Sequence, residues 1–330
     1  MHGDLGGAPS RPHALLHTHS GGHAARRTFS SDTDGTATTT VSGSGGSSIS
    51  GSGGGGGSGS GSSGTPARVS VVIMNWLRPD NVKRVLRQYT KYDAVLEVIV
   101  WMCHPDTRFN FSHAKVRIVD DVSANDLHGL STRFKGCLMA ASPWVLIQDD
   151  DHYLKEEGLA RMMAAKAASP TRLIGAFGRD WGGGWGDARY VRSPVRPGPV
   201  RIVLTVLMLT DTATCAAFWD AAPAVESFVA ARSSPLWNGE DIFFSLVAQR
   251  ASGLVPLVVR AKKVFMKQRG IGISQGDNAS ISHDAYRDAF LRHAVAALGL
   301  GNATLLPSGS EEEVGEVSRV AASSKANAAV

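Results

Sequence analysis

Three consecutive carboxylates, Asp149, Asp150 and Asp151, follow an apolar run at residues 144–148 near the middle of the chain. Because like charges repel, a folded domain tolerates such a triplet only where water, hydrogen-bond donors or a cation compensate. Alternate side chains of a strand share a direction, so we expect Asp149 and Asp151 to point together and Asp150 to point away. Two convergent carboxylates suit Mn²⁺ or Mg²⁺, hard cations that bridge to a diphosphate and neutralise its charge as it departs.

A second interpretation of the triplet is a solvated turn in which Asp151 caps the following helix. The acidic motif alone does not separate the two interpretations, because short motifs recur by chance. The apolar run before the triplet predicts a buried strand that ends at a ligand site, and it therefore favours the metal.

A further acidic pair, Glu240 and Asp241, opens an apolar stretch with helical character. The segment by itself favours a structural role, in which the two carboxylates stabilise the helix N-terminus through capping and the helix dipole. In the alternative, one of them faces the reaction centre, where it orients an acceptor hydroxyl or stabilises a developing cation.

Two arginines and a histidine are candidates for binding anionic groups. Arg78 follows the first predicted strand, and Arg133 precedes the triplet. A guanidinium recognises phosphate and carbonyl edges well, although each arginine taken alone is more typical of the surface. His283 is a candidate metal or phosphate ligand, and a structural role is its alternative.

The elements that position these residues alternate between strands and helices in the first half of the chain. Apolar, β-branched runs predict the strands, and the spacing of apolar residues predicts the helices. The strands are expected at 69–74, 96–101, 115–119 and 144–148, and the helices at 82–89, capped by Asp80 or Asn81, and at 131–141. This alternation predicts an α/β fold with a doubly wound, mostly parallel sheet. Such sheets bind ligands at the carboxyl ends of their strands, where Asn75 and the triplet lie.

The second half of the core is less regular. Its pattern predicts helices at 157–168, 241–250 and 283–298, strands at 173–177 and 201–209, and a glycine-rich loop at 182–186. Beyond residue 300 the composition predicts little order, apart from a short acidic helix at 311–320.

Length and composition indicate one domain preceded by a long polar segment. Of the 330 residues, those at 42–64 are almost pure Gly and Ser, and they predict flexible coil. We therefore expect a disordered segment and linker at 1–68, one domain at 69–300 and a poorly ordered tail at 301–330.

Charge and cysteine content exclude several classes of protein. The net charge is +5, and the basic residues are dispersed without a Lys/Arg stripe, so no nucleic-acid partner is expected. Cys103, Cys137 and Cys215 have no metal-binding spacing and are too few for a disulfide scaffold, so we expect three small buried side chains. No apolar run is long enough to predict a membrane-spanning helix.

Taken in order, a set of segments resembles the glycosyltransferase family 64 domain of exostosin and exostosin-like proteins. The resemblance covers roughly residues 69–298 and is more specific than the triplet, which many sugar-nucleotide transferases share. The matching segments are Val-Ile-Met-Asn-Trp-Leu-Arg-Pro-Asp (72–80), Val-Ile-Val-Trp (98–101), Ser-Thr-Arg-Phe (131–134), Val-Leu-Ile-Gln-Asp-Asp-Asp (145–151) and Asn-Gly-Glu-Asp-Ile (238–242).

The resemblance implies a single catalytic domain of the GT-A fold, which is Rossmann-like with helices on both faces of the sheet. It implies an enzyme that uses Mn²⁺, or Mg²⁺ in its place, to transfer a sugar with retention of configuration. The sugar, typically an N-acetylhexosamine, would pass from a UDP-sugar bound by residues 69–155 to a glycan or glycoprotein acceptor bound by residues 156–300. Two other hypotheses stay open. One is an inverting transferase with Asp241 as general base, and the other is a catalytically weak relative that binds glycan or nucleotide.

On the donor side, the resemblance gives a role to each candidate residue. Asn75 and Arg78 would contact the nucleotide. Arg133 would hold the uridine or the diphosphate. Asp149 and Asp150 would face the ribose and the uridine.

On the metal and reacting side, Asp151 would bind the metal directly, and His283 would be a weaker ligand near the diphosphate. Asp241 would be the catalytic carboxylate, with Glu240 beside it. The chain departs from the family pattern at Gly239, where the family has a disulfide-forming cysteine. It departs again where Met-Cys-His follows Trp101 in place of two asparagines.

A third departure lies near the end of the core. Asp284 stands where an arginine usually follows the family's histidine, and Arg287 lies one helical turn further on. The resemblance also implies a Golgi or secretory location, which sequons at Asn110, Asn278 and Asn302 permit. Membrane association would need an anchor that this chain does not contain, so a soluble form or a fragment is an alternative. No oligomeric state is predicted.

Overall fold

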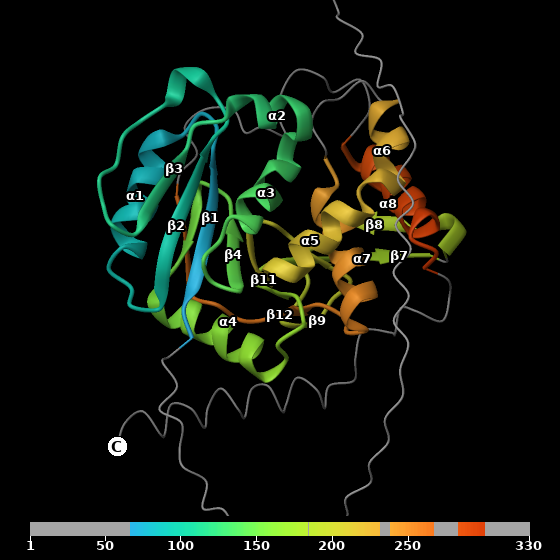
Figure 1. The fold of residues 1–330 in the computed structure, drawn as a ribbon. Helices are drawn as coiled ribbons and strands as arrows, with labels where there is room; N and C mark the ends of the chain where they lie inside the picture. Colours follow the sequence, from blue (N-terminus) through green and yellow to red (C-terminus); the bar gives the residue numbers. More distant parts are fainter. Residues whose placement is uncertain (1–66, 184, 232–237, 267–282, 301–330) are drawn as a thin grey trace, which may run out of the picture. The chain divides into compact units, whose positions relative to one another are not determined.

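The computed structural model describes residues 67–183, 185–231, 238–266 and 283–300, and its centre is an eight-stranded sheet (Figure 1). Along the sheet the strands are β3 (Val116–Val119), β2 (Val95–Met102), β1 (Val69–Asn75), β4 (Trp144–Gln148), β11 (Leu207–Asp211), β6 (Ile174–Gly175), β12 (Leu257–Val258) and β9 (Gly198–Pro199). β11 runs antiparallel to β4 and β6, and β9 runs antiparallel to β12. The other neighbours are parallel. The prediction of a mostly parallel α/β sheet is therefore confirmed.

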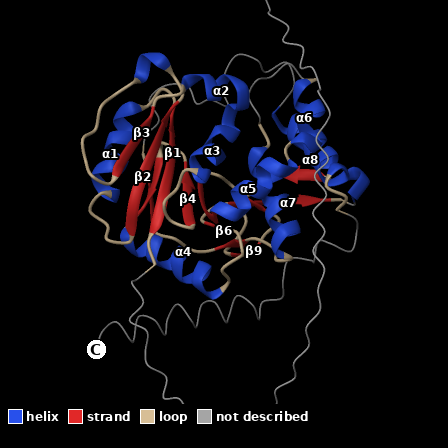
Figure 2. Cartoon of the chain, viewed as in Figure 1, coloured by secondary structure: helices blue, strands red, loops and turns tan. Residues whose placement is uncertain are grey.

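Helices cover both faces of this sheet, as predicted (Figure 2). Val71 and Ile73 of β1 belong to a buried cluster with residues of α1 (Pro79–Tyr89) and α4 (Glu156–Ala168). Val72 belongs to a cluster on the opposite face, with residues of α3 (Thr132–Leu138), α5 (Thr212–Ala221) and α7 (Glu240–Ser252). A strand buried on both faces is apolar at successive positions, which explains why the sequence of β1 is so easily recognised.

The predicted helix at 82–89 is present but begins earlier. α1 starts at Pro79, whose fixed φ suits the first turn of a helix. The N-cap residue is Arg78, without a side-chain cap, so the prediction of capping by Asp80 or Asn81 is wrong. α2 (Val122–His128), which the sequence did not predict, precedes α3.

The predicted strand at 201–209 is divided between two sheets. β10 (Ile202–Val203) pairs with β7 (Gly178–Gly182), whereas β11 joins the central sheet. A turn at Thr205 separates them. Thr205 is the one polar residue in the run at 202–209, and a single threonine between apolar residues does not by itself indicate a turn.

Short strands and further helices complete the described residues. β7 also pairs with β8 (Arg189–Val191), and β5 (His152–Leu154) pairs with β13 (Lys263–Phe265). The predicted helices at 157–168, 241–250 and 283–298 correspond to α4, α7 and α8 (His283–Ala297), whereas α5 and α6 (Pro223–Ala230) were not predicted. The expected loop is partly regular, because Gly182 ends β7 and Trp185–Asp187 forms a short 3₁₀ helix. Among the described helices, none has the length and apolar character needed to cross a bilayer.

The prediction of three unpaired cysteines is wrong for two of them. Cys137 of α3 and Cys215 of α5 form a disulfide across 78 residues of sequence, and Cys103 is free and buried. The two helices pack side by side on one face of the sheet. Spacing along the chain gave no hint of that contact, because it depends on the tertiary fold. The predictions for residues 1–66 and 301–330 lie outside the described residues.

Candidate active site

The triplet lies in a turn directly after β4, at the carboxyl edge of the central sheet. Gln148, the last residue of β4, anchors this turn. Its side-chain oxygen accepts a hydrogen bond from the Tyr89 hydroxyl (2.5 Å), and its side-chain nitrogen donates to the His152 carbonyl (2.8 Å). The Tyr89 hydroxyl also accepts from the backbone N–H of Leu154 (2.9 Å). A buried tyrosine of α1 therefore holds both ends of the turn.

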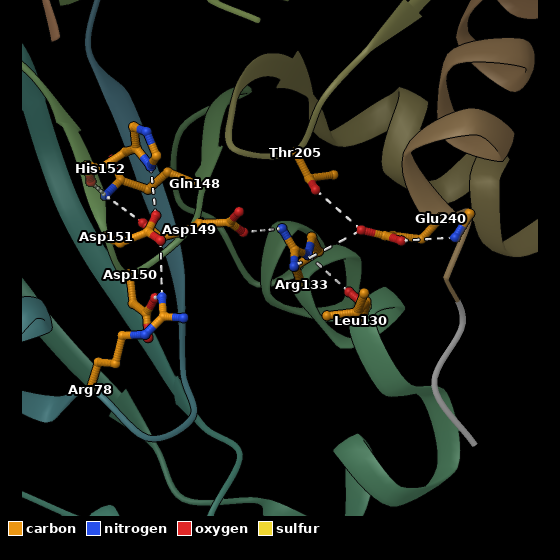
Figure 3. Close-up of polar contacts among 11 residues, drawn as sticks. Arg78, Leu130, Arg133, Gln148, Asp149, Asp150, Asp151, His152, Thr205 and Glu240 are labelled. Atoms are coloured by element: carbon orange, nitrogen blue, oxygen red, sulfur yellow. Dashed lines mark hydrogen bonds and ion pairs between the residues drawn. The ribbon is translucent and has the colours of Figure 1, made fainter. Parts of the chain in front are cut away.

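The three carboxylates divide between two arginines (Figure 3). Nη1 of Arg78 donates to Oδ1 of Asp150 (2.7 Å) and to Oδ2 of Asp151 (3.0 Å). Asp149 turns the other way and accepts from Nη1 of Arg133 (2.8 Å). The expectation that Asp149 and Asp151 point together is therefore wrong. β4 ends before the triplet, so the alternation of a strand does not continue into the turn.

Asp150 has a strongly shifted pKa. Burial raises it most, since the charged carboxylate loses its water, and with the charges of Asp149 and Asp151 also acting upward the pKa of Asp150 reaches about 7. Arg78 opposes this shift, but it shares its positive charge with Asp151. Asp150 therefore takes up a proton near neutral pH.

Asp151 does not cap the following helix, since the N-cap of α4 is Lys155, so the capping interpretation is wrong. Its carboxylate oxygens are of the type that binds a hard cation. Its Oδ2 accepts from Arg78, and its Oδ1 lies 2.5 Å from Nδ1 of His152. Carboxylate oxygens are the ligands that hard cations prefer, and one such oxygen can accept a hydrogen bond and bind a cation at the same time. Within the described ranges, no group of three or more His, Cys, Asp and Glu side chains could hold a metal by itself. The residues fit a cation that takes one or two protein oxygens and completes its shell with phosphate and water.

Arg133 connects the triplet to the second half of the domain (Figure 3). The side chain is buried in the first turn of α3, and its Nε donates to the Leu130 carbonyl (2.9 Å). Nη1 binds Asp149, while Nη2 lies 4.0 Å from Oε1 of Glu240. Two carboxylates far apart in sequence therefore share one buried guanidinium.

Glu240 is buried in the first turn of α7. Its Oε1 accepts from the Thr205 hydroxyl (3.2 Å), and its Oε2 accepts from the backbone N–H of Gly239 (3.2 Å). Burial raises the pKa of Glu240, and the adjacent charge of Asp241 raises it further. Thr205 comes from the turn between β10 and β11, so that turn helps to position Glu240.

Asp241 is bound by Arg287, a residue to which the sequence assigned no role. Nη2 of Arg287 donates to both oxygens of Asp241, at 2.6 Å each, and Nη1 donates to Oδ1 of Asn238 (3.0 Å). The guanidinium carbon also lies 4.4 Å from the centre of the Tyr190 ring, a cation–π distance. Arg287 and Asp241 are both buried.

The signal that could have indicated Arg287 was its spacing on α8. Residues three or four apart on a helix lie on the same face, so Arg287 lies one turn from Asp284, the position at which the family carries its arginine. Asp284 instead lies 3.5 Å from Arg192, and both side chains are largely exposed. His283 is the first residue of α8, and its side chain is outside the described residues.

The N-cap of α7 is Gly239, so neither member of the acidic pair is the cap, but both lie in the first turn of α7, where the predicted interaction with the helix dipole applies. Gly239 has a φ of 148°, which L side chains rarely adopt. A Cβ there would lie 2.6 Å from a ring atom of Phe290. Glycine therefore fits a position where the family cysteine would not, and Glu240 and Asp241 are free to turn toward the site.

Asn75 ends β1 and is fully buried. Its Nδ2 donates to the Thr107 carbonyl (3.0 Å), while Oδ1 has no hydrogen-bond partner among the described residues. A buried acceptor without a partner at the carboxyl end of a strand suits an N–H donor of a ligand.

The structure thus brings most of the predicted residues into two linked groups. One guanidinium binds Asp150 and Asp151, and a second lies between Asp149 and Glu240. Asp241, next in sequence to Glu240, continues the network to α8. Asn75 lies at the same sheet edge, but its side chain bonds to Met102 and Thr107 rather than to these groups in the described part of the chain.

Comparison with known proteins gives one family match. A model of the glycosyl transferase family 64 domain matches residues 69–300. Among solved structures, the chain is similar to GalNAc-T7 crystallised with UDP, GalNAc and Mn²⁺, at 14% identity and a TM-score of 0.44. The similarity covers 77% of this chain and 54% of that one, so the chain spans about half of that protein's length. No curated protein matches the chain.

Proposed function

Because the chain belongs to glycosyltransferase family 64, we propose that it transfers a sugar from a UDP-sugar to a glycan or glycoprotein acceptor. The proposal includes an N-acetylhexosamine as the sugar, retention of configuration, and the GT-A fold for residues 69–300. The observation that carries it is the position of Arg133 between Asp149 and Glu240. This buried guanidinium joins the carboxylates on the donor side to those on the reacting side.

The donor would bind at the carboxyl edge of β1 and β4. Arg78 places a positive charge beside the triplet, where it would attract a diphosphate. Asn75 offers its unpartnered Oδ1 to an N–H group of the base. About a third of the Asp149 side chain is exposed (34%), whereas Asp150 is buried, so Asp149 is the more accessible carboxylate for ribose hydroxyls.

Asp151 would hold Mn²⁺ or Mg²⁺, with His283 as a weaker candidate ligand. When bound, such a cation supplies Lewis-acid neutralisation of the charge on the diphosphate leaving group. The protein itself would hold the metal-binding carboxylate of Asp151 in a fixed position. Arg78 and His152 each bind one oxygen of Asp151, and the backbone N–H of Met266 binds its carbonyl (2.8 Å).

Asp241 would act on the reacting side as a fixed negative charge. Both of its oxygens accept from Arg287, and Oδ1 also accepts from the backbone N–H of Ile242 (2.8 Å). A carboxylate held by these donors is suited to stabilise positive charge on the sugar, and poorly placed to take a proton from an acceptor hydroxyl. This arrangement supports retention over an inverting mechanism with Asp241 as base.

The test is the hydrolysis and transfer of a panel of UDP-sugars with Mn²⁺, with Mg²⁺ and with a chelator. The variant is Asp151→Asn, and the control is Asp126→Asn, an exposed aspartate of α2. We expect metal-dependent turnover in the wild type and the control, and a loss of roughly 10²- to 10³-fold in the variant. Metal-independent turnover that survives Asp151→Asn would contradict the proposal.

Two further readouts separate the alternative functions. NMR of the product reports its anomeric configuration, and an inverted product would contradict retention. Calorimetry with UDP reports binding, and binding without turnover would identify a non-catalytic relative.

We also propose a Golgi or secretory location. The Cys137–Cys215 disulfide supports it, because structural disulfides persist in oxidising compartments. The sequon at Asn110 lies on an exposed residue, where a glycan could be attached. Expression in a eukaryotic secretory host should give a chain that glycosidase treatment shifts on a gel, with a smaller shift for Asn110→Gln. An unshifted wild-type chain would contradict this location.

A further inference from the structure

A group of three aromatic rings lies beside the triplet, two of them on the small β5–β13 sheet and one after β6. It consists of His152, Phe177 and Phe265, which we call the aromatic cluster. The ring of His152 lies 5.3 Å from that of Phe177 and 5.0 Å from that of Phe265. His152 and Phe265 are direct partners across the two strands, so the register of this sheet sets their contact.

The aromatic cluster is fixed against Asp151. His152 binds the Asp151 carboxylate through Nδ1, and Met266, the residue after Phe265, donates its backbone N–H to the Asp151 carbonyl. Phe177 follows β6, which runs in the same direction as β4, so it lies at the same carboxyl edge of the central sheet as the triplet. The rings therefore border the candidate active site.

Phe265 presents its ring to solvent. It is 60% exposed, and it is the one aromatic side chain among the large hydrophobic residues that are exposed in the described ranges. Lys263, two residues earlier on β13, places its amine 4.4 Å from the centre of the Phe177 ring. Phe265 and Lys263 lie two residues apart on β13 and therefore share a side of the strand, so the exposed apolar ring has a hydrogen-bond donor on the same side.

We propose that the aromatic cluster, with Phe265 outermost, binds a hexopyranose ring of the acceptor glycan. A pyranose has an apolar C–H face and a hydroxylated rim, and the negative face of an aromatic ring attracts such C–H groups. The Lys263 amine would donate to the hydroxyls at the rim. A glycan seated here would extend from the site past Asp151 along β13. This inference rests on the proposed function, because that function supplies the reason for a glycan at this edge.

The direct test is saturation-transfer NMR on the full chain without nucleotide, with methyl β-galactopyranoside as the probe. The variants are Phe265→Ala and Phe265→Tyr, and the control is Leu254→Ala, an exposed apolar residue outside the site. We expect saturation of the C–H face of the probe in the wild type, in Phe265→Tyr and in the control. The signal should fall roughly fivefold in Phe265→Ala. Equal saturation in Phe265→Ala, or none in the wild type, would overturn the inference.

Transfer kinetics provide a second readout. Phe265→Ala should raise the KM for a galactoside acceptor roughly fivefold, and Leu254→Ala should leave it unchanged. An unchanged KM in Phe265→Ala would also overturn the inference. The two proposals fail separately. A wild-type chain that binds the galactoside but never turns over a UDP-sugar refutes the proposed function alone, whereas one that turns over UDP-sugars without saturating the probe refutes this inference alone.

Discussion

Arg287 of α8 binds both carboxylate oxygens of Asp241 of α7 through one nitrogen, at 2.6 Å each. The pair is buried, and Asn238 and Tyr190 engage the same guanidinium. A buried carboxylate in the second half of the domain is therefore paired with an arginine, as the triplet is in the first half. The arginine that makes this contact lies one helical turn away from the position at which the family carries one.

We predict that Arg287→Lys lowers kcat by roughly 10²- to 10³-fold, because an ammonium cannot replace the planar guanidinium that binds Asp241, Asn238 and the Tyr190 ring together. Turnover of a UDP-sugar is the measurement. Arg292→Lys on the same helix is the control, since Arg292 binds only a backbone carbonyl, that of Ala188, in the contacts described (3.1 Å). Equal activity in the two variants would mean that Arg287 serves packing rather than the reaction.

The free energy of unfolding should also depend on the ion pair between Arg287 and Asp241. Arg287→Met leaves Asp241 as an unpaired buried charge, which costs about 3–5 kcal/mol in the free energy of unfolding. The double variant with Asp241→Asn should recover part of that loss, because the buried charge is gone. Denaturant unfolding measures both, and additive losses in the double variant would show that the two side chains are not coupled.

The shifted pKa of Asp150 predicts a dependence of stability on pH. The folded protein holds this proton up to about pH 7, whereas the unfolded chain releases it near the ordinary value of 3.8. Between these values the folded state binds more protons, so the free energy of unfolding falls as pH rises. Asp150→Asn keeps an oxygen for Arg78 but carries no charge, and it should remove about 2–4 kcal/mol of this fall.

The measurement for Asp150 is denaturant unfolding at pH 5 and pH 8 with a chelator present, so that no bound cation interferes. Asp80→Asn is the matched control, because the Asp80 side chain is 94% exposed. A wild-type chain that loses no more stability between the two pH values than Asp150→Asn would refute the assigned pKa.

The sequence predicted the first half of the fold well because its strands are buried on both faces. Val71 and Val72 lie in different clusters, so β1 is buried on both faces, and its residues from Val71 to Met74 form a continuous apolar run. Strand alternation failed for Asp149 and Asp151, since it describes the strand and not the turn after it. The apolar run at 202–209 also concealed the boundary near Thr205, because one threonine does not distinguish two strands of different sheets from one long strand.

The residue types of the site could be read from the sequence, but their pairing could not. Arg133 and Glu240 come from different helices, and so do Arg287 and Asp241. Their contacts depend on how α3, α7 and α8 pack, which local periodicity does not encode. The same reason explains the Cys137–Cys215 disulfide, which spacing alone gave no cause to expect.

Gly239 should be the most sensitive glycine near the site. Gly239→Ala requires a φ near 148° and places a Cβ against Phe290, so it should cost about 2–3 kcal/mol in stability and displace Glu240. Gly253→Ala is the control, because Gly253 also has a positive φ (70°), but its Cβ would meet nothing within 4 Å. Thermal unfolding of the two variants compares them, and equal losses would show that the contact with Phe290 carries no cost.

The disulfide should stabilise the domain on the face of the sheet that carries Arg133. Cys137→Ser opens a loop closed over 78 residues, which should cost about 2–4 kcal/mol in the free energy of unfolding. Cys137 lies one helical turn after Arg133 on α3, so a loosened helix should also weaken the contact of Arg133 with Asp149 and lower turnover. Cys103→Ser is the matched control, since Cys103 is buried but unpaired. The effect of a reductant on the wild type should match that of Cys137→Ser, and a reductant without effect on stability would contradict the disulfide.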